Sequence, residues 1–134
     1  MSKVYVACPW HDRDLAKEAA RKLEEAGHVI SHNWWDYDNG DQVDSDYHKR
    51  CAKDDLNAVM ESDVLFLMNL QERGKETSGK AVETGLALAL NYIHGPKFIK
   101  IFMQGVKTNV FHCLDDFEYV SGVEEVIEKL MEGH

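Results

Sequence analysis

Short runs of β-forming residues alternate along this chain with longer segments of helical periodicity, and this alternation limits the fold more than any other feature. The short runs predict buried strands, and the apolar spacing between them predicts amphipathic or buried helices. Strands that alternate with helices form a parallel sheet covered on both faces. The sequence predicts strands at residues 4–7, 28–31, 63–68, 98–102 and 117–120, and helices at residues 14–26, 47–62, 79–94 and 123–131.

The expected architecture is therefore a doubly wound α/β fold of the flavodoxin or Rossmann-like kind, with a five-stranded parallel sheet and helices on both faces. Such sheets bind ligands at the carboxyl ends of their strands, near the point where the strand order reverses. The segments after the first three predicted strands would then border one pocket. The longest of them, residues 33–46, is polar and aromatic, and long loops in compact domains are often functional.

The bulk composition favours a globular protein and disfavours several kinds of partner. The chain has 134 residues, which we interpret as one domain over residues 1–134, and a formal net charge of −9. That charge argues against nucleic acid and anionic membranes as partners. Three cysteines without a CxxC pair, no signal-peptide pattern and no bilayer-spanning apolar run lead us to expect a reduced, cytoplasmic protein.

The predicted helix at residues 79–94 carries one carboxylate, Glu83, among residues that are apolar or small on nearly every side. A helix of that composition is expected to be buried. A buried carboxylate needs a partner or has a role. The position of Glu83 near the amino end of the helix predicts a carboxylate kept charged by the helix dipole. The alternative is a capping or ion-pairing role with Lys80 or Arg73.

A second carboxylate, Asp55, is predicted to face inward. At about 100° per residue it falls in the middle of an apolar helix face, whereas Asp54 points away. We expect that face to consist of Cys51, Ala52, Leu56, Val59 and Met60. An apolar setting makes Asp55 the better candidate for a raised pKa, and two carboxylates in different environments suit the cleavage of a glycosidic bond. The alternative is that Asp55 caps a neighbouring loop.

Aromatic residues and a polar loop complete the candidate pocket. Tyr5, on the first strand, reaches the pocket if that strand neighbours the third, or is a core tyrosine. Trp10, Trp34 and Trp35 lie in loops, where they stack on a planar base or cover an edge of the core. The loop at residues 73–79 leads into a helix start, which favours anions, but it lacks the Walker sequence. No dinucleotide fingerprint and no metal-ligand spacing is present, so we expect no cofactor and no metal.

Taken together, four ordered segments resemble the nucleoside 2-deoxyribosyltransferase family. They are the opening strand followed by Trp10, the Asp55-Leu56-Asn57 helix segment, the run from Gly79 through Glu83 to Gly85, and Thr108-Asn109-Val110. The resemblance covers most of the chain. It implies that Glu83 is the nucleophile, that Asp55 handles protons, that Tyr5 orients Glu83, and that Asn109 enters the pocket of another subunit in a homodimer or larger oligomer.

The resemblance leaves the substrate open. Ala81 stands where the family has a second glycine, and Thr77 and Ser78 stand near the place of an aspartate that holds the sugar 5′-hydroxyl. Hydroxyls there resemble the related deoxynucleoside 5′-monophosphate N-hydrolases. We therefore expect Trp10, Thr77, Ser78, Gly79 and Asn109 to bind a small nucleoside or nucleotide. The readings that remain are a transferase, a monophosphate N-hydrolase, and a nucleotide-binding module without catalysis.

Overall fold

The structure, a computed structural model, describes residues 1–37, 44–70 and 79–132. A five-stranded sheet forms its centre, with the strand order β2-β1-β3-β4-β5 and every neighbouring pair parallel. The predicted fold class, a doubly wound parallel α/β sheet, is confirmed. The strands are β1 (Lys3–Ala7), β2 (Val29–Ile30), β3 (Val64–Asn69), β4 (Lys100–Gly105) and β5 (Phe117–Tyr119).

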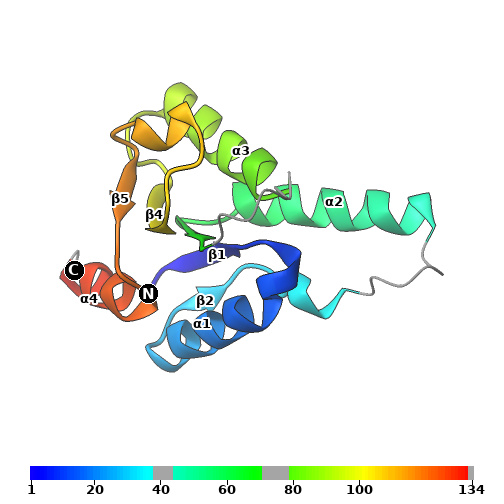
Figure 1. The fold of residues 1–134 in the computed structure, drawn as a ribbon, viewed down its shortest axis with the longest axis horizontal. Coiled ribbons are helices and arrows are strands. Elements are labelled where there is room, and N and C mark those ends of the chain that lie inside the picture. The colour runs from blue at the N-terminus through cyan, green and yellow to red at the C-terminus, as the bar shows by residue number, and fades with distance from the viewer. Residues whose placement is uncertain (38–43, 71–78, 133–134) are drawn as a thin grey trace.

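Helices cover both faces of the sheet (Figure 1). Helices α1 (Arg13–Glu25) and α4 (Val123–Glu132) pack against each other on one face, and α2 (Ser45–Met60) and α3 (Gly79–His94) pack together on the other. The strand order reverses between β1 and β3, which pair directly from Val4↔Val64 to Ala7↔Leu67. The carboxyl ends of these two strands are where the fold predicts a ligand.

Most element boundaries lie within a few residues of the prediction, and the departures have local causes. Helix α2 begins two residues before the predicted start, because the side chain of Asp44 accepts a hydrogen bond from the backbone N–H of Tyr47 (2.9 Å) and caps it. Strand β4 begins only at Lys100, since the turn before it places Lys97 at a φ of 64°. Three 3₁₀ turns, Trp10–Asp12, Trp34–Asp36 and Val110–Cys113, were not predicted.

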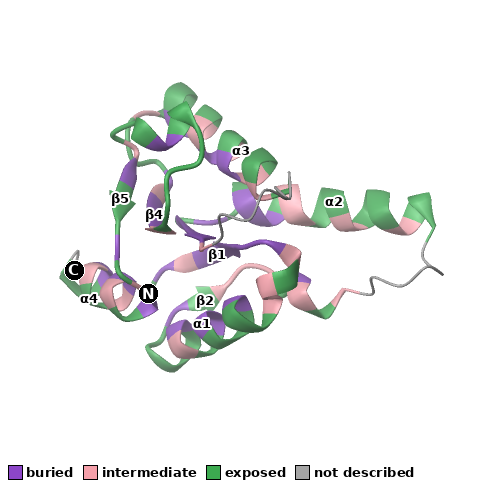
Figure 2. Ribbon diagram, viewed as in Figure 1, coloured by how far each residue is buried: buried purple, intermediate pink, exposed green. Residues whose placement is uncertain are grey.

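The core lies on β1 and β3, whose side chains are buried on both faces of the sheet (Figure 2). Fully buried strands flanked by helices on both sides account for the continuous apolar runs in the sequence. Tyr5 and Asn69 are the polar exceptions, and both have no exposed surface. No helix in the described part of the chain is long and apolar enough to cross a bilayer.

Helix α3 is not buried on every side, and this prediction was wrong. Val82 is 58% exposed, Ile93 is 71% exposed and Tyr92 is 93% exposed, whereas Thr84, Ala87 and Asn91 face the sheet and are buried. An all-apolar helix is buried only if something covers each side. In a single chain the sheet covers one side of α3 and leaves an apolar side uncovered.

A backbone contact fixes the segment that follows β4. Gly105 has a φ of 108°, and a Cβ at this position would lie 2.0 Å from the backbone oxygen of Asn69. The Asn69 side chain also donates to the backbone oxygen of Val106 (2.5 Å) and to the hydroxyl of Thr108 (3.2 Å). The chain therefore leaves the sheet in one direction and carries Asn109 and Phe111 towards α3.

Candidate active site

Tyr5 and Glu83 form the centre of the site. Tyr5 lies on β1 with its ring under α3, and its hydroxyl donates a hydrogen bond to Oε2 of Glu83 at 2.6 Å. Glu83 lies in the second turn of α3 and is partly buried. The adjacency of β1 and β3 is what brings residues 78 positions apart into contact. A short hydrogen bond to a carboxylate oxygen fixes the orientation of the carboxyl group.

Asp55 approaches the same centre from α2. It is partly buried while Asp54 is exposed, which is the predicted orientation, although the predicted apolar face differs. Ala52 and Met60 are exposed, and the residues of α2 that are fully buried are Ala58 and Val59. The reason is that only the last turns of α2 pack on the body of the protein, so that the first turns project into solvent (Figure 1).

Two further residues contact Asp55, and the sequence did not single them out. The Tyr37 hydroxyl lies 3.0 Å from Oδ1 of Asp55 and is hydrogen-bonded to Nε2 of His32. His32 Nε2 lies 3.7 Å from the same Asp55 oxygen. Both residues follow β2, at the edge of the sheet where ligands bind. The polar and aromatic character of residues 33–46 marked this region as functional, but no local pattern identified His32 or Tyr37.

The pKa of Glu83 is raised to about 8 by burial of its carboxyl group, with Asp55 as a further cause and the Tyr5 hydrogen bond opposing. The prediction of a carboxylate kept charged by the helix dipole was wrong. Glu83 lies beyond the first turn, where the dipole acts, and loss of hydration outweighs it. A pKa raised in this way favours the protonated form of Glu83 in the free protein.

Burial also raises the pKa of Asp55, against the hydrogen bond from Tyr37 and the proximity of His32. The pKa values of the Tyr5 and Tyr37 hydroxyls are raised as well, first by burial and then by Glu83 and Asp55 respectively. Both tyrosines thus remain protonated and act as hydrogen-bond donors. Two carboxyl groups with raised pKa values, linked through neutral hydroxyls, are typical of a site that moves protons.

The tryptophans divide between the core and the edge of the site. Trp34 is buried, and its Nε1 donates to the backbone oxygen of Val6 (2.6 Å), so it covers the end of β1. Trp10 is partly buried beside Trp34, and the guanidinium carbon of Arg13 lies 4.7 Å from its ring centroid. Trp35 packs edge-on against Trp34. These contacts support the core-covering interpretation for Trp34, whereas Trp10 stays a candidate for base contact.

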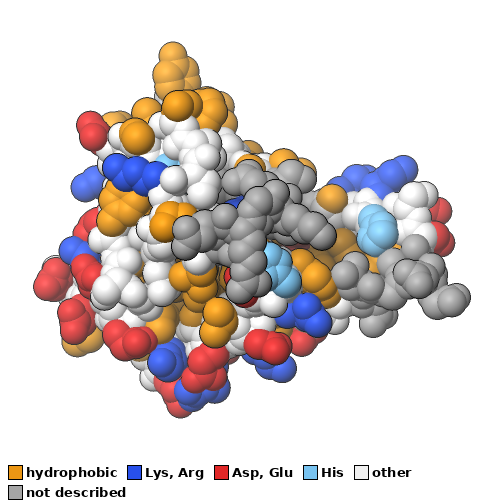
Figure 3. Space-filling model, viewed as in Figure 1, with side chains coloured by type: hydrophobic (Ala, Val, Ile, Leu, Met, Phe, Trp, Pro, Cys, Tyr) orange, Lys and Arg blue, Asp and Glu red, His pale blue; other side chains and the backbone are white. Residues whose placement is uncertain are grey.

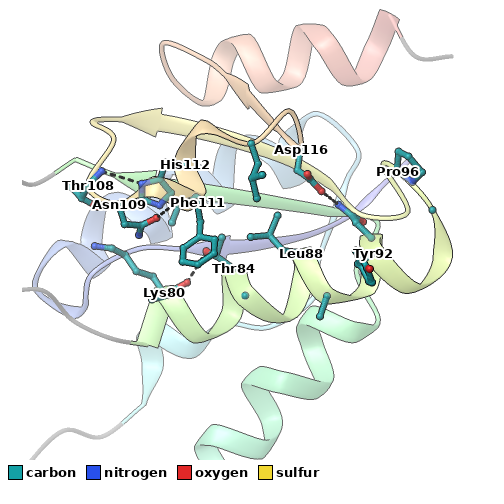
Figure 4. A pocket seen from close by; sticks show the side chains of 17 residues that line it. Lys80, Thr84, Leu88, Tyr92, Pro96, Thr108, Asn109, Phe111, His112 and Asp116 are labelled. Carbon is teal, nitrogen blue, oxygen red and sulfur yellow. Dashed lines mark hydrogen bonds between the residues drawn. The ribbon is translucent and has the colours of Figure 1, made fainter.

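On its other flank, α3 borders an apolar groove of about 830 Å³ (Figure 4). Lys80, Thr84 and Tyr92 of α3 form one wall, and the segment from Thr108 to Asp116 forms the other. The lining includes Asn109, whose side chain accepts from the backbone N–H of Phe111 (2.9 Å). It includes none of Tyr5, Asp55 and Glu83. Within one chain, then, Asn109 faces a different space from the carboxylates.

The remaining predicted residues have simpler placements. Gly79 is the exposed first residue of α3. Thr77 and Ser78 lie outside the described residues, as do Arg73 and residues 38–43. The described residues hold no group of three His, Cys, Asp or Glu side chains that would bind a metal ion. Cys8 is buried, which raises the pKa of its thiol to about 12 and makes it a poor nucleophile.

No protein-family model matches the chain, and no curated protein matches it at the sequence level. Solved structures do match. The CMP N-glycosidase BcmB of Clostridium botulinum is 18% identical, with a TM-score of 0.57, over 97% of this chain and 98% of that one. A 2-deoxyribosyltransferase of Bacillus psychrosaccharolyticus is 18% identical, with a TM-score of 0.61, over 93% and 90%. A conserved protein of Enterococcus faecalis is 15% identical, with a TM-score of 0.63, over 100% and 99%. At these identities the likeness shows the fold alone.

Proposed function

We propose that this protein cleaves the N-glycosidic bond of a 2-deoxyribonucleoside through a covalent intermediate on Glu83 and transfers the sugar to an acceptor base. The observation that carries the proposal is the arrangement of Glu83 and Asp55 around the Tyr5 hydroxyl at the carboxyl end of β1 and β3. Two further facts support the proposal. The sequence motifs resemble those of the nucleoside 2-deoxyribosyltransferase family, and two of the structures that share the fold are a CMP N-glycosidase and a 2-deoxyribosyltransferase.

In the reactive form Glu83 is ionised and Asp55 carries a proton. An oxygen of Glu83 attacks the anomeric carbon, and the bond to the base nitrogen breaks with its electron pair going to the base. Asp55 gives its proton to that base, leaving a deoxyribosyl ester on Glu83. The acceptor base then attacks the same carbon, the ester bond breaks, and Asp55 recovers the proton that the acceptor nitrogen loses.

The hydrogen bond from Tyr5 stabilises the ionised Glu83 against the effect of its burial. The free protein favours the opposite arrangement, with the proton on Glu83, because Glu83 is the more strongly desolvated group. Positive charge that develops on the sugar carbon reverses this preference, since it stabilises the adjacent carboxylate more in the transition state than in the ground state. Binding energy from the base and sugar thus contributes to ionising the nucleophile.

The same proposal includes a second copy of the chain on the apolar flank of α3. Exposed apolar side chains gather over the end of α3 and residues 110–114 at the upper edge of the molecule, whereas charged side chains gather over α1 and α4 at the lower edge (Figure 3). A patch of this kind is typical of an interface. Because Asn109 lines the groove and not the carboxylate site of its own chain, it is available to a partner's site.

One observation favours a second candidate, a nucleotide N-hydrolase. Lys80 lies one turn before Glu83 on α3 and makes no ion pair with any described residue. Lys80 lines the groove side of α3, and a free cation at this amino end of the helix suits a 5′-phosphate that extends past the Glu83 turn. The likeness in fold to a CMP N-glycosidase adds to this alternative.

Base release from deoxynucleosides and deoxynucleoside monophosphates, each with and without a free acceptor base, separates the candidates. Exchange of bases on a nucleoside supports the transferase. Release from the monophosphate without any acceptor supports the hydrolase. If neither substrate is turned over, both are excluded and a nucleotide-binding module without catalysis remains.

Subunit mixing tests the shared site. A Glu83→Gln chain and an Asn109→Ala chain are each expected to be inactive, but a mixed dimer contains one site with both wild-type residues. Mixing after mild denaturation and refolding should restore about a quarter of the wild-type activity, because half of the dimers are mixed and each has one intact site. Absence of any recovery in dimers shown to be mixed would contradict the role of Asn109.

A further inference from the structure

A continuous series of hydrogen bonds links His32 to Asp55 through Tyr37. His32 Nε2 is bonded to the Tyr37 hydroxyl, and that hydroxyl is bonded to Oδ1 of Asp55 at 3.0 Å. The His32 side chain is 21% exposed and the Asp55 side chain is 24% exposed, so both ends of the series are partly open to water. The three residues come from the segment after β2 and from α2.

Each of the three side chains can both give and take a proton. Tyr37 takes one only as it gives its own away, so it acts as a bridge. A phenol hydroxyl is donor and acceptor, an imidazole carries a proton on either nitrogen, and a carboxyl group carries one or none. The hydroxyl has one hydrogen, and its contact with Asp55 at 3.0 Å is shorter than its contact with the backbone oxygen of Cys51 at 3.3 Å. Tyr37 therefore donates to Asp55 and accepts from His32, which places a hydrogen on Nε2.

We propose that His32 and Tyr37 form a proton relay that supplies Asp55 with the proton it gives to the leaving base. The proposal rests on the proposed function and extends it to two residues that do not touch the substrate. A neutral His32 with its hydrogen on Nε2 passes that hydrogen to the Tyr37 oxygen while its other ring nitrogen takes a proton from the solvent, and the Tyr37 hydroxyl proton passes to Asp55. His32 stays neutral with its hydrogen on Nδ1, and return of a hydrogen to Nε2 by ring rotation or exchange with solvent resets the relay. The charges and protons balance without any other reactant.

The electrostatics of the site show what the relay adds. Burial and the neighbouring acid raise the pKa of Glu83 to about 8, so Glu83 holds the proton of the pair in the free protein. That proton can pass to Asp55 within the pair, and the relay gives Asp55 a second route to a proton that does not depend on Glu83. The other groups that face Asp55 are Asp54 on α2 and Tyr5 on β1.

The test compares two substrates that differ only in how much their base needs a proton. For purines they are deoxyguanosine and its N7-methyl derivative, whose base is already cationic; for pyrimidines they are deoxyuridine and its 5-nitro derivative, whose base leaves as a stable anion.

Tyr37→Phe removes the bridging hydroxyl. His32→Gln keeps a polar group near Tyr37 but does not exchange protons. His48→Gln, at an exposed position on α2, is the control.

We expect Tyr37→Phe and His32→Gln each to slow kcat for the unactivated substrate by roughly 10- to 100-fold, within the range of general acid catalysis. The activated substrate should keep its wild-type rate within about twofold, and the double variant should be no slower than the slower single one, since both residues act in one chain. Equal slowing of both substrates, or no slowing of either, overturns the relay. If the wild-type protein turns over no substrate, the proposed function itself fails instead.

Discussion

The two flanks of α3 differ in how complete they are within one chain. On the flank towards α2, Glu83 has a hydrogen-bond donor in Tyr5 and a second acid nearby in Asp55. On the flank towards residues 108–116, apolar side chains remain exposed around the groove. Within the same chain, Glu83 on the polar flank has groups that contact it, whereas the exposed apolar side chains on the other flank are not covered by any described residue. Under the proposed function, one helix serves both as the wall of the active site and as the surface for assembly.

The largest effect is expected from Glu83→Gln, which removes the proposed nucleophile and keeps the size of the side chain on the polar flank. Turnover should fall by at least about 10³-fold, because the covalent step has no other carboxylate to replace it. Steady-state base release measures this, with Glu128→Gln on the exposed side of α4 as the control. A Glu83→Gln protein within tenfold of the wild type would show that the polar flank is not the catalytic wall.

A smaller loss is expected from Asp55→Asn, because proton donation assists the reaction but does not form the new bond. The expected fall in kcat is about 10²-fold. Asp54→Asn provides a matched control, since it changes the same residue type one position away, on the exposed side of α2. If the two variants lose activity equally, the inward orientation of Asp55 has no role in catalysis.

The apolar flank is tested by Ala89→Glu, which places a charge in the groove at an exposed position of α3. A buried charge at an interface disfavours association, so sedimentation at micromolar concentration should show monomers where the wild type forms dimers. Ala52→Glu, exposed on α2, should leave assembly unchanged. A wild type that is already monomeric, or an Ala89→Glu protein that still forms dimers, would contradict the assignment of this flank.

The last effect is one of folding stability and not of activity. Because the folded pKa of Glu83 is about 8 and its usual value is 4.5, ionisation of Glu83 opposes folding. The destabilising contribution of Glu83 is therefore absent below pH 4.5 and grows as the pH rises towards 8. Glu83→Gln has no such contribution and should be more stable than the wild type by up to about 5 kcal/mol at pH 9. Thermal unfolding across pH 4 to 9 measures the gap; a gap that widens towards acid would contradict the raised pKa.

The sequence was sufficient for the features that depend on periodicity. The strands and helices follow from short apolar runs and helical spacing, and the inward turn of Asp55 follows from its phase on α2. The contact of Tyr5 with Glu83 needed the strand order as well, because it joins residues on β1 and α3.

Three features could not be predicted from local pattern. His32 and Tyr37 reach Asp55 only through the path of the chain after β2, which no periodicity describes. The exposure of Tyr92 and Val82 could not be predicted from composition. An apolar helix has the same composition whether its outer side packs against the core of its own chain or against another chain. The pKa of Glu83 depended on how far burial outweighs the helix dipole, which only the packing determines.

The close approach of Gly105 to Asn69 has a consequence for how this protein tolerates change. The segment carrying Asn109 and Phe111 is located by backbone atoms, with 2.0 Å between a hypothetical Cβ and the Asn69 oxygen. The apolar side chains along the groove make none of the polar contacts that hold the segment and can vary without moving it, whereas any side chain at position 105 displaces it. Natural variation is therefore expected to be wide among the apolar groove residues and confined to glycine at position 105, so that the surface of the groove can change while the path of the segment stays the same.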